Sequence, residues 1–173
     1  MNYADMEKLA REAGFDHVAP LDPGTIELKE EVRQMCADCG RYAKHWSCPP
    51  GCGTLESCAQ RVRGYQSGML LQTVGQLEDE FDGEAMMETQ DQHKANFSKL
   101  CGMLQKADVL KLGAGCCTIC KECTYPAEAC RFPEKMVSSM EAYGMVVAEV
   151  CKANNQPYYY GKNTIAYTSC VLF

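Results

Sequence analysis

Residues 113–133 read GAGCCTICKECTYPAEACRFP and contain five cysteines. Cys117, Cys120 and Cys123 follow one another at steps of three residues, and Cys130 comes later in the same stretch. A CxxCxxC run can bind three corners of a cubane iron–sulfur cluster, while the fourth iron takes a ligand from elsewhere. The stretch therefore predicts a metal-binding loop, and its spacing favours a 4Fe-4S cluster.

Two other uses of these thiols stay open. Zinc prefers four tetrahedral ligands, often as two separated CxxC pairs, which Cys36/Cys39 and Cys117/Cys120 would supply. That arrangement leaves the candidate ligands Cys48, Cys123 and Cys130 unused, so zinc is the alternative cofactor. A redox-active dithiol needs a thiolate of lowered pKa, and the sequence shows no base beside these cysteines.

A second cysteine-rich stretch lies earlier in the chain. Residues 36–58 read CADCGRYAKHWSCPPGCGTLESC, and their glycines and prolines predict a loop that is ordered by a bound ligand. Cys36, Cys39 and Cys48 are three candidate ligands, and two prolines follow Cys48. A proline after a ligand stiffens the turn and removes an amide that would need a partner.

Two cubanes need eight thiolates, and the two loops supply them. Cys52 is the best candidate for the eighth ligand and Cys58 is the next. The predicted metal and cofactor ligands are Cys36, Cys39, Cys48, Cys52, Cys117, Cys120, Cys123 and Cys130. The distribution of these cysteines between the clusters is left open by the sequence.

Composition limits the class of protein. The chain has 173 residues, 46% of them hydrophobic, which is enough for a core without disulfide staples. Thirteen cysteines cannot all pair with one another, and clustered cysteines in a reducing compartment favour metal binding. The net charge of −6 argues against binding to nucleic acid or to an anionic membrane. We find no long apolar run and no secretory pattern at the N-terminus, so we expect a cytoplasmic protein.

The pattern of apolar residues predicts one domain over 1–173, with an α+β or small α/β fold. Helices are expected over 4–13, 29–35, 77–107 and 134–153, and strands within 15–28, 67–75, 107–113 and the C-terminal segment. Alternation of these elements predicts a central sheet of three to five strands flanked by helices, with the cysteine loops 36–58 and 113–133 attached.

Several other residues have plain structural interpretations. Cys101, Cys151 and Cys170 fall inside predicted helices or a strand, where a free cysteine behaves as a small core residue. Cys116 adjoins a ligand but is expected to take no part in binding. The acidic stretch 78–88 is expected to be a solvated surface, and the alternative is that it docks a basic redox partner.

The two cysteine groups together resemble a known family. The motifs are CxxC with WSCPP at 46–50, CxxCxxC with CRFP at 130–133, and SMEAYG at 139–144. This combination is similar to that of small cysteine-rich proteins described as predicted metal-binding, a domain of unknown function, over about residues 36–173. The resemblance implies metal binding, most plausibly as iron–sulfur, and implies no particular reaction.

The leading functional hypothesis is an iron–sulfur protein with up to two 4Fe-4S clusters that exchanges electrons with a partner redox enzyme. One alternative is an iron–sulfur enzyme or reductive activator that acts on a small substrate or a corrinoid cofactor. The other is a zinc module that organises a protein interface. The sequence leaves open whether the protein is an enzyme, and it leaves the oligomeric state open.

Overall fold

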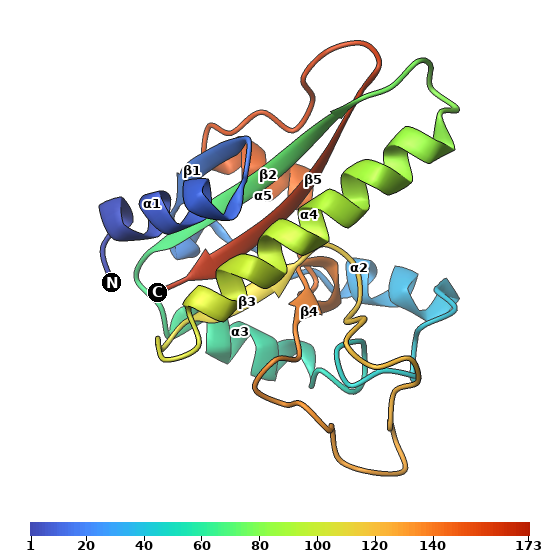
Figure 1. Ribbon diagram of the computed structural model, residues 1–173. Helices are drawn as coiled ribbons and strands as arrows, with labels where there is room; N and C mark the ends of the chain where they lie inside the picture. Colours follow the sequence, from blue (N-terminus) through green and yellow to red (C-terminus); the bar gives the residue numbers. More distant parts are fainter.

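The computed structural model describes residues 1–173 as an α+β fold, which confirms the predicted class. Its centre is a five-stranded sheet with strand order β1-β2-β5-β3-β4 (Figure 1). Neighbouring strands are antiparallel except β3 and β4, which pair in parallel. The strands are β1 (His17–Leu21), β2 (Gly68–Gln76), β3 (Leu110–Gly113), β4 (Ser138–Ser139) and β5 (Thr164–Leu172).

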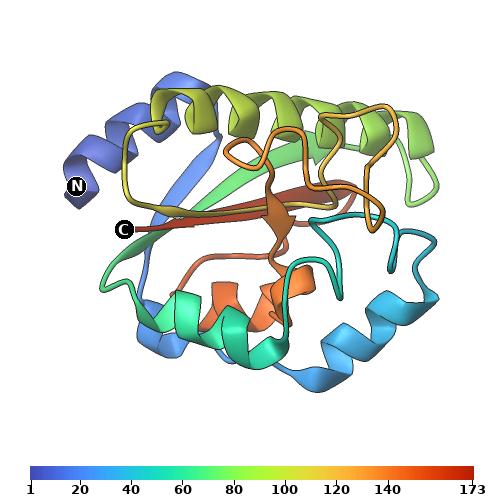
Figure 2. The same cartoon turned by 90° about the horizontal axis from the view of Figure 1, so that it is seen from below.

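Helices cover both faces of this sheet. In Figure 2, α1 (Tyr3–Ala13) and α4 (Gly83–Met103) form the upper layer, while α2 (Glu30–Met35), α3 (Leu55–Arg63) and α5 (Val147–Ala153) form the lower one. Successive side chains of a strand point to opposite faces. Met69 and Leu71 of β2 therefore join the core under α1 and α4, and Leu70 joins the core over α3 and α5.

Most predicted elements are confirmed, with shifted ends. The helix predicted over 4–13 is α1, and the left-handed Gly14 ends it. The segment predicted over 77–107 becomes helical only at Gly83, because the Asp82 carboxylate accepts the amide of Ala85 and caps the first turn. Phe97, Leu100 and Leu104 recur at the spacing of one helix face, and all three are buried.

The prediction of one helix over 134–153 is wrong. The segment instead contains β4, a 3-10 turn (Glu141–Tyr143) and the short helix α5. Gly144 interrupts it with a φ of 93°, and a Cβ at that position would lie 3.0 Å from the carbonyl oxygen of Lys29. The Lys29 amide donates to the Gly144 carbonyl oxygen at 2.7 Å, so a contact with a distant segment overrides the local helical pattern.

The two cysteine loops lie side by side at the β3–β4 end of the sheet (Figures 1 and 2). The prediction of a loop over all of 36–58 needs correction, since α3 begins at Leu55 and places Cys58 on a helix. Between α2 and Thr54, the one regular element of the loop is a 3-10 turn (Cys36–Asp38). No helix of the structure has both the length and the apolar character needed to cross a membrane.

Candidate metal centre

Four cysteines of the second loop share one cavity. The residues that line it include Cys117, Cys120, Cys123 and Cys130. Its remaining wall includes residues 45–47 of the first loop and Arg131, and it contains no aspartate or glutamate. The fold thus brings together every ligand that was predicted in residues 113–133.

The loop that carries these cysteines is closed by side-chain hydrogen bonds to its own backbone. The Thr124 hydroxyl donates to the carbonyl oxygen of Ala129 at 2.9 Å, and Arg131 donates to that of Glu122 at 2.9 Å. The loop has no helix or strand between β3 and β4, so these bonds replace the backbone ladders that order other segments.

Trp46 of the first loop holds the second loop in place. Its Nε1 donates to the carbonyl oxygen of Glu128 at 3.0 Å, and its ring meets Tyr125 edge to face, with 4.8 Å between centroids. Trp46 also lines the four-cysteine cavity, so the first loop supplies part of the wall around these cysteines.

The Cys117 sulfur lies in a polar backbone environment. Burial raises the pKa of the Cys117 thiol, while hydrogen bonds from the amides of Ile119 and Val137 oppose that rise. The Cys117 amide itself donates to the Ser47 hydroxyl at 3.2 Å, which ties the two loops together. Amides that donate to a sulfur stabilise its thiolate form, which is the form that binds metal.

In the first loop, Cys36 and Cys39 lie directly after the end of α2, at the start and the end of one 3-10 turn. The Cys39 amide donates to the Cys36 carbonyl oxygen at 3.1 Å. Burial raises the pKa of the Cys36 thiol, and the positive charge of Arg33 acts in the opposite direction. Cys36 is half-buried and Cys39 is exposed, so both residues lie nearer the surface than the buried Cys48.

Cys48 lies deeper, at the start of a tight turn. Its carbonyl oxygen accepts the Cys52 amide at 3.0 Å, and a Cβ on Gly51 would come within 2.6 Å of the His45 carbonyl oxygen, so the turn requires glycine there. The Cys48 thiol also meets Cys116 of the second loop. A hydrogen bond from Cys48 lowers the pKa of Cys116 to about 6 and raises that of Cys48.

Cys52 and Cys58 form a second buried pair of thiols. The hydrogen bond with Cys52, together with the positive charges of Arg61 and Arg33, lowers the pKa of Cys58 to about 6. Each arginine places a guanidinium nitrogen 3.6 Å from the Cys58 sulfur. Cys58 is thus the thiol of the first group around which the most positive charge gathers.

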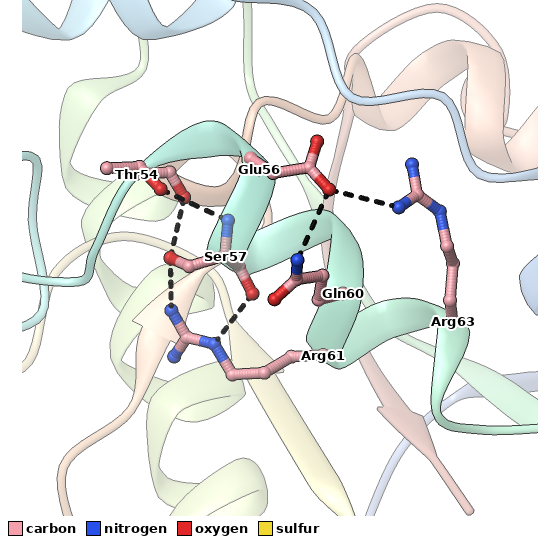
Figure 3. Close-up of polar contacts among 6 residues, drawn as sticks. All are labelled: Thr54, Glu56, Ser57, Gln60, Arg61 and Arg63. Carbon is pink, nitrogen blue, oxygen red and sulfur yellow. Dashed lines mark hydrogen bonds and ion pairs between the residues drawn. The ribbon is translucent and has the colours of Figure 1, made fainter.

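The first turns of α3 hold Arg61 in this position. Thr54 caps the helix by accepting the Ser57 amide at 3.1 Å, and Arg61 folds back to donate to the Ser57 carbonyl oxygen at 3.2 Å (Figure 3). The Arg61 guanidinium also stacks 5.0 Å from the centre of the Tyr143 ring. The cap, the ring and the carbonyl oxygens together fix the cation beside Cys58.

The thiols of the two loops form one connected series. Cys117 interacts electrostatically with Cys130 on one side and with Cys116 on the other. The thiols of Cys116 and Cys48 lie close enough to shift each other's pKa, and the Cys52 thiol also acts on Cys48. The two cysteine groups, about seventy residues apart in the sequence, therefore meet at Cys48 and Cys116.

The donor set fits a soft metal or an iron–sulfur cluster. Thiolates are the ligands that select zinc, copper(I) and iron–sulfur clusters, whereas magnesium and calcium require oxygen ligands. No three His, Cys, Asp or Glu side chains stand at the spacing that surrounds a single metal ion. The four cysteines line one cavity, and they are the residues that would hold a cluster.

Sequence reasoning missed some of these neighbours. Cys116, which was expected to take no part in metal binding, lies beside the thiol of the predicted ligand Cys48. No sequence pattern indicated that Arg33 and Arg61 lie beside a cysteine, because their contacts with Cys58 depend on how α2 and α3 pack. Cys151 and Cys170 are fully buried in the core, as predicted.

Comparison with known proteins agrees with this chemistry. The family model described as "Predicted metal-binding protein (DUF2284)" matches residues 19–173, which include all thirteen cysteines. Searches of curated proteins and of solved structures found no match. With most of its length matched, the chain belongs to the DUF2284 family of predicted metal-binding proteins.

Proposed function

We propose that this chain is a cytoplasmic iron–sulfur protein with up to two 4Fe-4S clusters, which exchanges electrons with a partner redox enzyme. The observation that carries the proposal is the cavity lined by Cys117, Cys120, Cys123 and Cys130 without any carboxylate. The three thiols of the CxxCxxC run and the later Cys130 together match the ligand number and type of one cubane.

A 4Fe-4S cluster bound in this cavity would supply one-electron transfer. The chain's own residues would bind it and set its potential. The amides of Ile119 and Val137 donate toward the Cys117 sulfur, Arg131 offsets negative charge, and Trp46 limits access of water. Hydrogen bonds to sulfur, net charge and solvent exposure are the levers by which proteins tune such potentials.

The first loop supports a second site. Cys36, Cys39 and Cys48 supply three thiols, and either Cys52 or Cys58 supplies the fourth. Cys58 has the stronger electrostatic support, because two guanidinium groups lie 3.6 Å from its sulfur. This favours Cys58 over the Cys52 that the sequence put first.

The contact between the two loops supports electron relay rather than two isolated sites. The Ser47 hydroxyl accepts a hydrogen bond from the Cys117 amide, and the thiols of Cys48 and Cys116 lie next to each other. Two centres held at these loops would be neighbours, so an electron that enters at one would have a short path to the other.

The experiment is anaerobic purification followed by assays of iron, acid-labile sulfide and zinc. We expect about four iron and four sulfide per cluster, with broad visible absorption that bleaches on reduction. Cys123→Ser should lose one cluster's share of iron, while Cys101→Ser, a cysteine of α4 outside the cavity, should keep it. Stoichiometric zinc with no sulfide would overturn the proposal in favour of a zinc module.

A paired comparison assigns the eighth ligand. Cys58→Ser should lower the iron content and change the EPR spectrum of the reduced protein, and Cys52→Ser should change neither. The reverse result would restore Cys52 as the ligand. If neither substitution changes the iron content, the first site has at most three protein ligands.

A further inference from the structure

A cleft of about 500 Å³ lies beside the candidate metal centre. It is bounded by α4, by the end of β3 with residues 114–119, and by residues 134–137. Phe97 and Val137 form an apolar floor, where the bare backbone of Gly113 packs so closely that a Cβ would stand 3.3 Å from Val137 and 3.5 Å from Phe97. Its volume is typical of a site for a small molecule.

The charge around this cleft is opposite in sign to that of the whole protein. Three lysines line it, Lys94, Lys111 and Lys135, against one carboxylate, Glu134. None of these lysines takes part in any of the ion pairs of the structure. In a chain with a net charge of −6, a cleft with three unpaired cations favours an anionic ligand.

The cleft shares a wall with the four-cysteine cavity. Cys117 and Ile119 line both spaces, and Cys116 lines the cleft. A molecule bound in the cleft would therefore lie against Cys117, a predicted metal ligand that also lines the cavity.

We propose that this cleft binds a small organic anion with an apolar body, oriented by Lys94 and Lys111 over the floor of Phe97. The apolar floor selects a hydrocarbon or aromatic body, and the lysines select its carboxylate or other anionic group. The role of the ligand beside a redox centre rests on the proposed function, whereas its binding depends only on the cleft.

The test uses two probes of the same shape, 2-naphthoate and the neutral 2-naphthamide, with binding measured by calorimetry on the anaerobically purified protein. We expect naphthoate to bind roughly tenfold more tightly, since each of two partly exposed charge contacts contributes modestly. Lys94→Gln with Lys111→Gln should remove this preference. The matched control is Lys8→Gln with Lys152→Gln, two exposed lysines outside the cleft, which should retain it.

A third variant tests the location without changing charge. Gly102 lines the cleft on α4 and has open space where a Cβ would stand. Gly102→Phe should fill the cleft and abolish binding of both probes. Equal binding of the two probes, no binding of naphthoate, or unchanged binding in Gly102→Phe would overturn the inference.

Iron and sulfide are measured on the same samples, so the two proposals fail separately. Full iron content without naphthoate binding would overturn the cleft alone. Selective naphthoate binding to a protein that carries zinc would keep the cleft and overturn the iron–sulfur proposal. With both present, a change in the EPR spectrum on adding naphthoate is expected from the shared wall.

Discussion

At the scale of single residues, the most unusual polar group outside the cysteine loops is His93. It is a fully buried residue of α4 that faces the sheet, where Nδ1 lies 3.0 Å from the Thr73 hydroxyl and Nε2 lies 2.6 Å from the Ser169 hydroxyl. Burial lowers the pKa of His93 to about 4. The ring therefore stays neutral in the folded protein down to about pH 4, although the same histidine takes up a proton near pH 6.5 in the unfolded chain.

This histidine predicts a loss of stability in weak acid. Between the ordinary histidine pKa and a folded pKa of about 4, only the unfolded state binds the proton, so the free energy of unfolding falls as the pH falls. The loss should approach about 3 kcal/mol by pH 4. Denaturant unfolding of wild type and His93→Gln from pH 8 to pH 4 measures it. Parallel curves for the two proteins would contradict the prediction.

Trp46 is the other residue whose contacts give a measurable expectation. Trp46→Phe keeps a ring against Tyr125 but loses the hydrogen bond to Glu128, which as an exposed bond contributes at most about 1 kcal/mol. We expect a chelator to remove metal roughly two- to fivefold faster from this variant. Tyr42→Phe is the control in the same loop, because the Tyr42 hydroxyl makes no hydrogen bond. Equal rates for wild type and Trp46→Phe would show that Trp46 does not clamp the second loop.

At the scale of elements, α3 links the fold to the first cysteine group. The helix has only nine residues, so its N-terminal cap contributes a large share of its stability. Its cap residue Thr54 lies two residues after Cys52, and its first turns carry Cys58 and Arg61. Figure 3 shows Thr54 at the start of this helix and Arg61 further along it.

We expect Thr54→Ala to lower the free energy of unfolding by about 1 kcal/mol and to speed hydrogen exchange at Ser57 and Cys58. Thr54→Ser keeps the capping oxygen and serves as the control. Exchange measured by mass spectrometry, with unfolding followed in urea, gives both quantities. If the alanine and serine variants behave alike, the hydroxyl cap does not hold this helix.

Elements also differ in how far the sequence determines them. The stripe at Phe97, Leu100 and Leu104 predicts α4 correctly, because a helix that packs on a sheet must repeat its apolar residues every turn. The apolar residues over 134–153 have a similar spacing, but they belong to different elements. Met140 and Tyr143 lie at the 3-10 turn and Val150 lies in α5, and all three are buried in the other core. What breaks that helix is the bond between Lys29 and Gly144, and no local pattern encodes such a contact.

The candidate site divides along the same line. A ligand set within one short loop, such as Cys117 to Cys130, can be predicted because chain geometry alone keeps the thiols close. The meeting of Cys48 with Cys116 and the arginines around Cys58 depend on the packing of distant elements. These contacts could be found only from the folded chain.

At the scale of the whole molecule, the sheet and the cysteine loops are held by different forces. The sheet lies between two apolar cores, of thirteen and ten buried residues. Strands β2 and β5 contribute side chains to both cores, one from each face of the sheet. The loops have few apolar contacts of this kind and rely on side-chain bonds such as Thr124 to Ala129 and Trp46 to Glu128. Metal bound by the loops would therefore add its stabilisation locally.

Removal of the metal should consequently disorder the loops and leave the sheet folded. We expect amides in 36–54 and 114–137 to lose most of their protection from hydrogen exchange after anaerobic chelation, because low local stability follows from few buried contacts. Amides of β2 and β5 should keep theirs, since the two apolar cores do not include the loops. Exchange of loaded and stripped protein, compared by mass spectrometry, measures both regions in one experiment. Protection lost across the whole chain would mean that the metal centre is required for the fold itself, and unchanged protection in the loops would mean that hydrogen bonds alone order them.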